Sequence, residues 1–256
     1  MIVVLGILLV GSIFLALMVG SLGRIGPGDP VKLSFHDAMD ALMGGSSYAW
    51  VFWDVRIPRV LMAALVGAAL ACAGTAMQAI FRNSMADPFV IGVSSGAALG
   101  AATAGVIGAG VIMGAYASPI FAFGSALAAV TIVYKLGSVK GKVYVDSLLL
   151  SGVAVAAFLG ALVSLLIYIA RQQYHQLLFW LLGSLALAST DKVLILLAPV
   201  LIGAFVVILY GRDLDALLMG EETAHNLGAS PEVLKKVILA VAAMMTAAAV
   251  AFSGVI

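Results

Sequence analysis

The stretch that decides the fold is Pro88–Tyr134, PFVIGVSSGAALGAATAGVIGAGVIMGAYASPIFAFGSALAAVTIVY, in which 47 consecutive residues include no Asp, Glu, Lys or Arg. A bilayer-spanning helix needs roughly 20 apolar residues, so this stretch can hold two spans. Pro119, which follows the small and polar residues around Tyr116–Ser118, is the natural point of division. Because backbone polar groups in lipid must be satisfied internally, both halves should be helical.

Other charge-free windows each have the length of one span. They are Met1–Gly23, Val60–Phe81, Ser147–Ala170, Val193–Gly211 and Val237–Ile256. The sequence therefore predicts an all-α polytopic membrane protein, a helical bundle with seven spans in a single transmembrane domain, residues 1–256. The spans are expected near residues 1–22, 60–80, 91–113, 119–136, 148–169, 192–210 and 235–254. A further charge-free window, Gln172–Thr190, has a short apolar part and is predicted to form an interfacial or re-entrant helix.

The composition excludes several classes of protein. Hydrophobic residues make up 64% of the 256, and charged residues only 10%, against about 25% in soluble domains. Cytosolic enzymes, disordered chains and nucleic-acid binders are therefore excluded. The net charge of +1 also lacks the excess of basic residues that nucleic-acid-binding proteins carry. The single cysteine, Cys72, excludes an internal disulfide framework and a cysteine-rich metal site.

The charge-free windows within the spans contain no Asp, Glu, Lys or Arg, which argues against transport driven by protons. The chain also lacks a G-x-x-x-x-G-K-[ST] phosphate-binding loop, so if nucleotide hydrolysis drives transport, a separate subunit must carry it out. The basic cluster Lys135–Lys142 favours an orientation with the N-terminus in the cytoplasm.

Two loops between spans carry patterned residues. Phe81–Pro88, FRNSMADP, is predicted to be either an ordinary capped turn or a narrow cytoplasmic constriction. Residues 211–236 form the second loop and include GEETAHNLG, Gly220–Gly228, a short helix with glutamates in its first turn. This helix either transmits force from a partner or belongs to a solvated helical hairpin. Ser230, Pro231 and Glu232 fit the cap and first positions of the next span.

A pair of arginines, Arg56 and Arg59, immediately precedes the second span, with Pro58 between them. The two side chains either anchor the helix at the membrane interface or bind carboxylates of a docking protein. The residue types alone leave these alternatives open.

These segments together resemble the FecCD-type permease family, the membrane subunit of ABC importers for iron–siderophore complexes, haem and cobalamin. The resemblance begins with RIPRVLMAALVGAALACAGTAMQAIFRNSMADPFVIGVSSGA, Arg56–Ala97. It continues through LLLSGVAV (Leu148–Val155), FWLLGSL (Phe179–Leu185) and GEETAHNLG. The four segments occur in the family's order over essentially the whole chain.

The resemblance implies a homodimeric permease with the type II ABC importer fold, about ten spanning helices per subunit, and a pathway along the dimer axis. Two cytoplasmic ATPase subunits would carry ATP and Mg, and an extracytoplasmic binding protein would deliver the cargo. This chain would bind no cofactor or metal and have no catalytic residues, and it would lie in the cell membrane.

The resemblance also implies roles for individual residues. The cytoplasmic gate would include Asn83, Ser84 and Met85. The coupling helix that docks on the ATPase would include Gly220, Glu221, Glu222, Ala224, His225, Leu227 and Gly228. Arg56 and Arg59 would meet acidic residues of the binding protein. The pathway lining would include Gly152, Ala156, Gly160 and Trp180.

The chain departs from the family pattern at two places. The family commonly has Asn-Pro-Leu-Ala where this chain has Asn83-Ser84-Met85-Ala86, so a looser turn is expected at the gate. The chain also ends at VAFSGVI, Val250–Ile256, where the family continues into three more helices, about 70–80 residues with their loops. Seven of the about ten helices are therefore expected here.

The leading hypothesis is an ATP-driven importer permease that moves a metal chelate by alternating access, with iron–siderophore or haem as the first candidates and cobalamin next. The alternatives are an ion-independent secondary carrier or channel, and a membrane-embedded enzyme. The enzyme would need convergent His, Asp or Glu inside the bundle, and the spans contain none. Uptake measured without ATP distinguishes the carrier from the importer.

Overall fold

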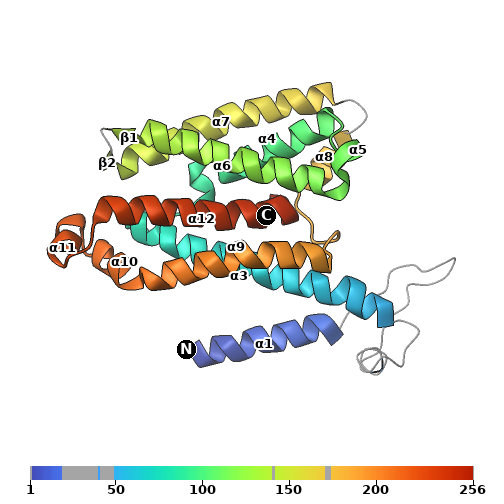
Figure 1. Cartoon of the computed structure of the whole chain (residues 1–256), viewed down its shortest axis with the longest axis horizontal. Helices are drawn as coiled ribbons and strands as arrows, with labels where there is room; N and C mark the ends of the chain where they lie inside the picture. The colour runs from blue at the N-terminus through green and yellow to red at the C-terminus, as the bar shows by residue number, and fades with distance from the viewer. Residues whose placement is uncertain (1, 19–39, 41–48, 140–141, 171–173, 256) are drawn as a thin grey trace. The chain divides into compact units, whose positions relative to one another are not determined.

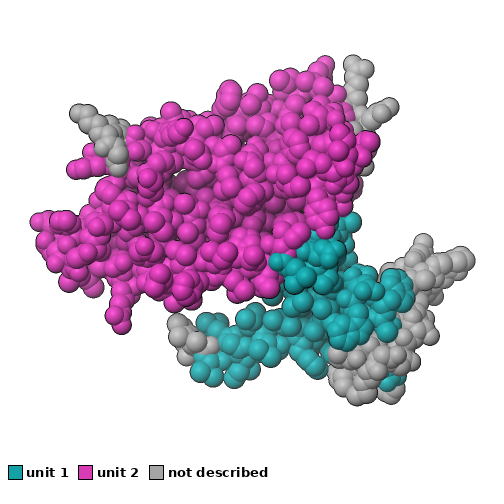
Figure 2. Space-filling view, in the orientation of Figure 1, with its two compact units in different colours: residues 1–64, 185–194 teal, residues 65–184, 195–256 magenta. Residues whose placement is uncertain are grey.

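The computed structural model of the chain describes residues 2–18, 40, 49–139, 142–170 and 174–255. The elements in chain order are α1 (Ile2–Met18), η1 (Val51–Arg56), α3 (Ile57–Phe81), η2 (Pro88–Ile91), α4 (Val93–Val106), α5 (Gly110–Met113), η3 (Gly114–Tyr116), α6 (Ala117–Gly137), β1 (Ser138–Val139), β2 (Lys142–Val143), α7 (Val145–Ile169), α8 (Tyr174–Leu181), α9 (Thr190–Leu209), α10 (Gly211–Leu218), α11 (Glu221–Asn226) and α12 (Pro231–Ser253) (Figure 1). The chain forms two compact units, residues 1–64 with 185–194 and residues 65–184 with 195–256 (Figure 2).

In the first unit, α1 packs on the helical segment that leads into α3. Met18 and Phe52 are buried together against Leu17 and Ile57. The Arg56 Nη1 group donates a hydrogen bond of 3.0 Å to the carbonyl oxygen of Leu17. The last carbonyls of a helix lack partners within the helix, so this bond caps the end of α1.

The second unit is a bundle in which α4 packs against α6 and α7, and α12 packs against α4 and α6 (Figure 1). Close approach of α4 and α6 depends on glycine. A Cβ on Gly96 would lie 2.9 Å from the carbonyl oxygen of Ser125, and a Cβ on Gly100 would overlap the carbonyl of Phe121. Small residues of this kind let helix backbones touch where lipid removes the hydrophobic drive for association.

The two ends of the second unit carry different elements. The antiparallel hairpin β1–β2, with Ser138 opposite Val143, lies at the same end as α10 and α11, and α5 and α8 lie at the opposite end (Figure 1). At that opposite end, the Ser184 N–H donates a 2.7 Å hydrogen bond to the carbonyl oxygen of Ser253. This bond ties the segment after α8 to the last residue of α12.

Within the described residues, five helical stretches are long and apolar enough to cross a membrane. They are Val51–Phe81, Gly110–Gly137, Val145–Ile169, Thr190–Leu209 and Pro231–Ser253. Each overlaps one of the spans expected from the sequence. The helices in the two other expected positions, α1 and α4, are apolar but shorter, with 17 and 14 residues.

The boundaries of two expected spans differ from the helices in the structure. The span expected near residues 91–113 corresponds to the shorter α4, because Gly92, with a φ of +81°, separates it from η2, and Gly108, with a φ of +67°, lies in the turn that follows. The span expected near residues 60–80 begins earlier, since η1 continues directly into α3. Arg59 therefore lies in the first turn of α3, next to Pro58, which is tolerated there because it needs no hydrogen-bond donor.

Candidate functional site

A cavity of about 340 Å³ lies in the second unit near α8 and is called here the α7 cavity. The residues that line it come from η2, α4, α7, α8 and the end of the described chain. They are Phe89, Ser94, Ser95, Ala98, Ala156, Gly160, Val163, Leu181 and Val255. The lining is mainly apolar, and its volume is at the lower end of the range for small-molecule sites, about 300–1,000 Å³.

Of the residues expected to line a pathway, Ala156 and Gly160 lie at the α7 cavity. The space next to Gly160 is open, with no atom within 4 Å of the position of an added Cβ. Gly152 lies elsewhere, because a Cβ there would overlap the carbonyl oxygen of Val90. The Trp180 carbonyl packs against Gly254, and it is the next residue, Leu181, that lines the cavity.

A second cavity of about 420 Å³ lies between α6, α7 and α12, toward the hairpin end. Its lining is almost entirely apolar and includes Leu127, Val130, Leu148 and Leu239, with Lys236 at the start of α12. None of the site residues expected from the sequence lines this cavity.

The expected gate residues lie in a tight turn between α3 and η2. Arg82 leaves α3 in the left-handed region, with a φ of +48°. The Asn83 side-chain oxygen accepts a 2.9 Å hydrogen bond from the Met85 N–H, and the Asn83 carbonyl accepts one of 3.0 Å from the Ala86 N–H. The turn is thus closed by both the side chain and the backbone of Asn83, without the proline that the family commonly has at position 84.

The turn exposes Met85, which is 85% accessible, next to the exposed Ser84. Asp87 then caps η2: its side chain accepts a 2.6 Å hydrogen bond from the Phe89 N–H, and Pro88 follows as the first residue of the turn of helix. The arrangement is a hydrogen-bonded connection with one long apolar side chain projecting from it.

The expected coupling residues form α11 and its two flanking turns. Gly220 and Gly228 bracket the helix with φ values of +123° and +90°, which favour glycine. Ala224 is fully buried and fixes the inner face of the helix. The outer face is formed by exposed side chains, which include Glu222, Thr223, His225, Asn226 and Leu227.

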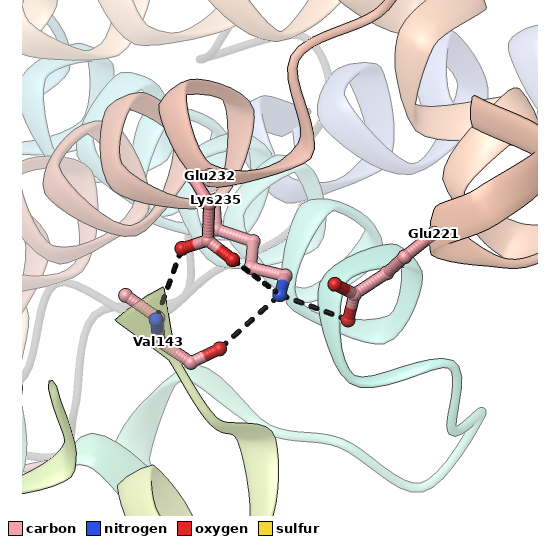
Figure 3. Close-up of polar contacts among 4 residues, drawn as sticks. All are labelled: Val143, Glu221, Glu232 and Lys235. Carbon is pink, nitrogen blue, oxygen red and sulfur yellow. Dashed lines mark hydrogen bonds and ion pairs between the residues drawn. The ribbon is translucent and has the colours of Figure 1, made fainter. Parts of the chain in front are cut away.

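Behind α11 lies a polar cluster that the sequence alone did not reveal (Figure 3). Lys235, in the second turn of α12, is 1% exposed, and its Nζ lies 2.8 Å from Glu221 Oε1 and 3.5 Å from Glu232 Oε1. Nζ also donates a 3.1 Å hydrogen bond to the carbonyl oxygen of Val143. The Val143 N–H in turn donates a 3.0 Å hydrogen bond to Glu232 Oε2.

The two expected docking arginines differ in their surroundings. Arg56 is partly buried, and its Nη1 bonds to Leu17 as described above; its Nη2 is buried with no hydrogen-bond partner among the described residues. Arg59 is exposed and donates a hydrogen bond of 3.3 Å to the carbonyl oxygen of Ala186. Arg59 is therefore the more accessible of the two to an acidic partner.

Taken together, apolar helices of membrane-spanning length, a glycine-packed bundle and polar residues gathered in short connecting elements define a multi-pass, all-α membrane protein. The chain belongs to the FecCD transport family, whose model matches residues 7–256. The resemblance recognised in the sequence is thereby confirmed.

The relatives of this chain include two named permeases. It is 42% identical over 202 residues to the cobalamin import system permease protein BtuC of Halobacterium salinarum, a match that covers 79% of this chain and 54% of the relative. It is 37% identical over 253 residues to the hemin transport system permease protein HmuU of Yersinia pestis, covering 97% of this chain and 75% of the relative. The chain thus spans between about half and three quarters of the length of these relatives.

Among solved structures, the fold is similar to one described as an inward-facing conformation of a metal-chelate type ABC transporter. The TM-score is 0.78 at 28% identity, and the match covers 98% of this chain and 73% of the other. The fold class predicted from the sequence, an all-α polytopic membrane protein of the ABC importer permease type, is confirmed by this match.

Proposed function

We propose that this chain is the membrane-spanning permease subunit of an ABC importer and translocates a metal chelate by alternating access. The observation that carries the proposal is the match of the FecCD transport family to residues 7–256, together with a structural match over 98% of the chain to a transporter of the metal-chelate type. The relatives are permeases for cobalamin and hemin, so the cargo proposed is a metal chelate of this kind.

The partners follow from the same family. A second copy of the permease would complete the pathway, two cytoplasmic ATPase subunits would hydrolyse ATP with Mg, and an extracytoplasmic protein would deliver the chelate. The sequence has no phosphate-binding loop of its own, in agreement with hydrolysis on separate subunits. The permease contributes differential binding of its conformations to these partners, which is what shifts a transporter between its states.

The role of α11 is to dock on the ATPase. Its inner face is fixed by Ala224, while Glu222, His225 and Leu227 are exposed and available for a partner. Leu227 is 69% accessible, and an exposed leucine beside charged and polar residues suits a protein contact. Asn83, Ser84 and Met85 form the cytoplasmic gate in this proposal, with Met85 as the projecting apolar residue.

The end of the second unit that carries α11 also carries several basic residues. Lys135 lies in the last turn of α6 and Lys142 in β2, and Arg212 and Lys236 lie on α10 and α12. Basic residues next to spans are enriched on the cytoplasmic side, so we propose that this end of the second unit faces the cytoplasm. The α7 cavity, toward the opposite end, then forms part of the cargo pathway.

The test is ATP hydrolysis by the reconstituted complex. The intact permease, its ATPase subunit and its binding protein are combined in lipid nanodiscs, and hydrolysis is measured with the binding protein empty or loaded with ferric siderophore, haem or cobalamin. We expect one loaded form to stimulate hydrolysis. Equal rates with every loaded and empty form, in a complex shown to be assembled, would contradict the proposal.

A further inference from the structure

The buried ammonium of Lys235 contacts polar groups from three elements. Its acceptors are Glu221 on α11, Glu232 on α12 itself and the backbone carbonyl of Val143 on β2 (Figure 3). A lysine ammonium has three donors and no acceptor, which suits it to two carboxylates and a carbonyl oxygen. The two carboxylates are partly exposed, at 41% and 38% of their side chains, whereas the lysine side chain is 2% exposed.

The position is not explained by helix stability. Lys235 lies near the N-terminus of α12, where the helix macrodipole disfavours a positive charge. Burial of an ammonium also costs free energy, and apolar residues of similar volume often replace buried ion pairs without loss of stability. The neighbouring residues Leu234, Ile238 and Leu239 are buried apolar side chains, which would accommodate methionine at this position.

The hairpin is held by the same two side chains. The N–H of Val143 donates to Glu232, and its carbonyl accepts from Lys235, so one turn of α12 satisfies both backbone groups of this residue. The pairing resembles that of a strand neighbour and covers the edge of the two-residue strand. Any shift of this turn of α12 along its axis therefore also shifts Val143.

The elements joined at Lys235 lead to the α7 cavity. Val143 stands two residues before α7, which carries Ala156, Gly160 and Val163 at that cavity. α12 ends at Ser253, two residues before Val255, which lines the same cavity. From Val145 to Ala156 the rise along α7 is about 16 Å, a distance that one helix spans as a rigid element.

We infer that Lys235 is a positioning residue that transmits displacement of α11 to α7 and α12, and through these helices to the α7 cavity. The inference builds on the proposed function, because α11 is displaced by the ATPase. Glu221 is the connection to α11, and Val143 is the connection to α7. Without the ammonium, α11 keeps its apolar contact through Ala224 but loses its polar link to both helices.

The test is the ratio of chelate taken up to ATP hydrolysed, measured in proteoliposomes that contain the intact permease, its ATPase and its binding protein. In Lys235→Met, we expect this ratio to fall at least about five-fold, the lower end of typical allosteric couplings, with ATP hydrolysis within about two-fold of wild type. Lys235→Arg retains the charge and is expected to keep most of the ratio. The adjacent, exposed Lys236→Met is the matched control and is expected to keep the wild-type ratio.

A second pair of variants addresses the connection to α11. Glu221→Gln is expected to lower the ratio as Lys235→Met does. Asp215→Asn, which changes an exposed carboxylate on α10 outside this cluster, is expected to leave the ratio unchanged. Because the two partners act through one contact, the double variant Glu221→Gln/Lys235→Met should lower the ratio no further than Lys235→Met alone.

Two results would overturn the inference. One is a Lys235→Met protein with wild-type uptake and hydrolysis, and the other is a proportional loss of both, which leaves the ratio unchanged and indicates a structural role only. Failure of the proposed function gives a different result, since wild-type proteoliposomes would then show no ATP-dependent uptake with any chelate.

Discussion

Gly100 on α4 lies so close to the backbone carbonyl of Phe121 on α6 that a Cβ at position 100 would overlap that carbonyl. Ser125 borders the same glycine, at 2.8 Å from the added Cβ position. The contact of two backbones at this point sets the distance between α4 and α6, and hence the position of the α4 residues at the α7 cavity, Ser94, Ser95 and Ala98.

The first prediction concerns this contact. Gly100→Ala should lower the free energy of unfolding by about 1–3 kcal/mol, because the added methyl forces two helices apart. The measurement is thermal unfolding in detergent micelles. Gly67→Ala on α3 is the control: its added methyl meets no atom within 4 Å, so stability should stay the same or increase by up to about 1 kcal/mol. Equal stability of the two variants would show that the α4–α6 contact has room for a methyl group at position 100.

The second prediction concerns the α7 cavity. Gly160→Leu places an apolar side chain in the open space beside α7 and should reduce chelate uptake roughly ten-fold, equivalent to about 1.4 kcal/mol on the transport barrier. Uptake is measured in proteoliposomes, with thermal unfolding as a check on folding. Gly124→Leu, at an exposed position on α6 outside the cavity, should keep wild-type uptake. Wild-type uptake by a stably folded Gly160→Leu protein would show that the α7 cavity is not part of the cargo pathway.

The third prediction concerns the turn that includes the proposed gate. Asp87→Ala removes the acceptor of the 2.6 Å bond from the Phe89 N–H and should destabilise the protein by about 1 kcal/mol. Asp87→Asn keeps an acceptor oxygen and should be close to wild type. Denaturant or thermal unfolding of the three proteins in one detergent compares them. If alanine and asparagine gave the same stability, the cap would be contributing nothing measurable.

The fourth prediction concerns docking of the extracytoplasmic binding protein. Arg59→Glu should weaken association with that protein, more strongly at low than at high ionic strength, because an exposed charge acts over about one Debye length. Arg56→Gln should instead loosen α1, since Arg56 bonds to the Leu17 carbonyl. Binding kinetics at two salt concentrations and thermal unfolding separate these effects. A salt-independent affinity in Arg59→Glu would argue against a docking role for this residue.

The spans could be located from the sequence because charges are excluded from lipid so strongly that their absence alone marks the helices. The N-terminal cap of α12 was also predicted from the sequence. Ser230 is the N-cap and Pro231 follows it in the structure. The break in the helix at Gly92 could not be predicted, because glycine at every fourth residue is equally typical of a continuous helix face that packs against another helix. Only the backbone conformation shows that Gly92 separates η2 from α4 while Gly96 and Gly100 pack against α6.

The residues of the α7 cavity could be predicted only in part. Gly152 and Gly160 belong to one stripe on α7, yet Gly152 packs against the Val90 carbonyl and Gly160 lies at the α7 cavity. Which glycine meets a neighbour depends on helix packing, which spacing does not encode. The Lys235 cluster was missed because its acceptor on Val143 is 92 residues away in the sequence. A lysine in the second turn of a helix, opposed by the macrodipole, was the available signal.

The most direct measurement for the account is uptake of a metal chelate into proteoliposomes that contain the intact permease and its ATPase, with loaded binding protein outside and ATP either enclosed or omitted. An importer driven by separate ATPase subunits predicts accumulation with ATP and none without it. Equal uptake in the two conditions would identify a carrier or channel and would contradict the account.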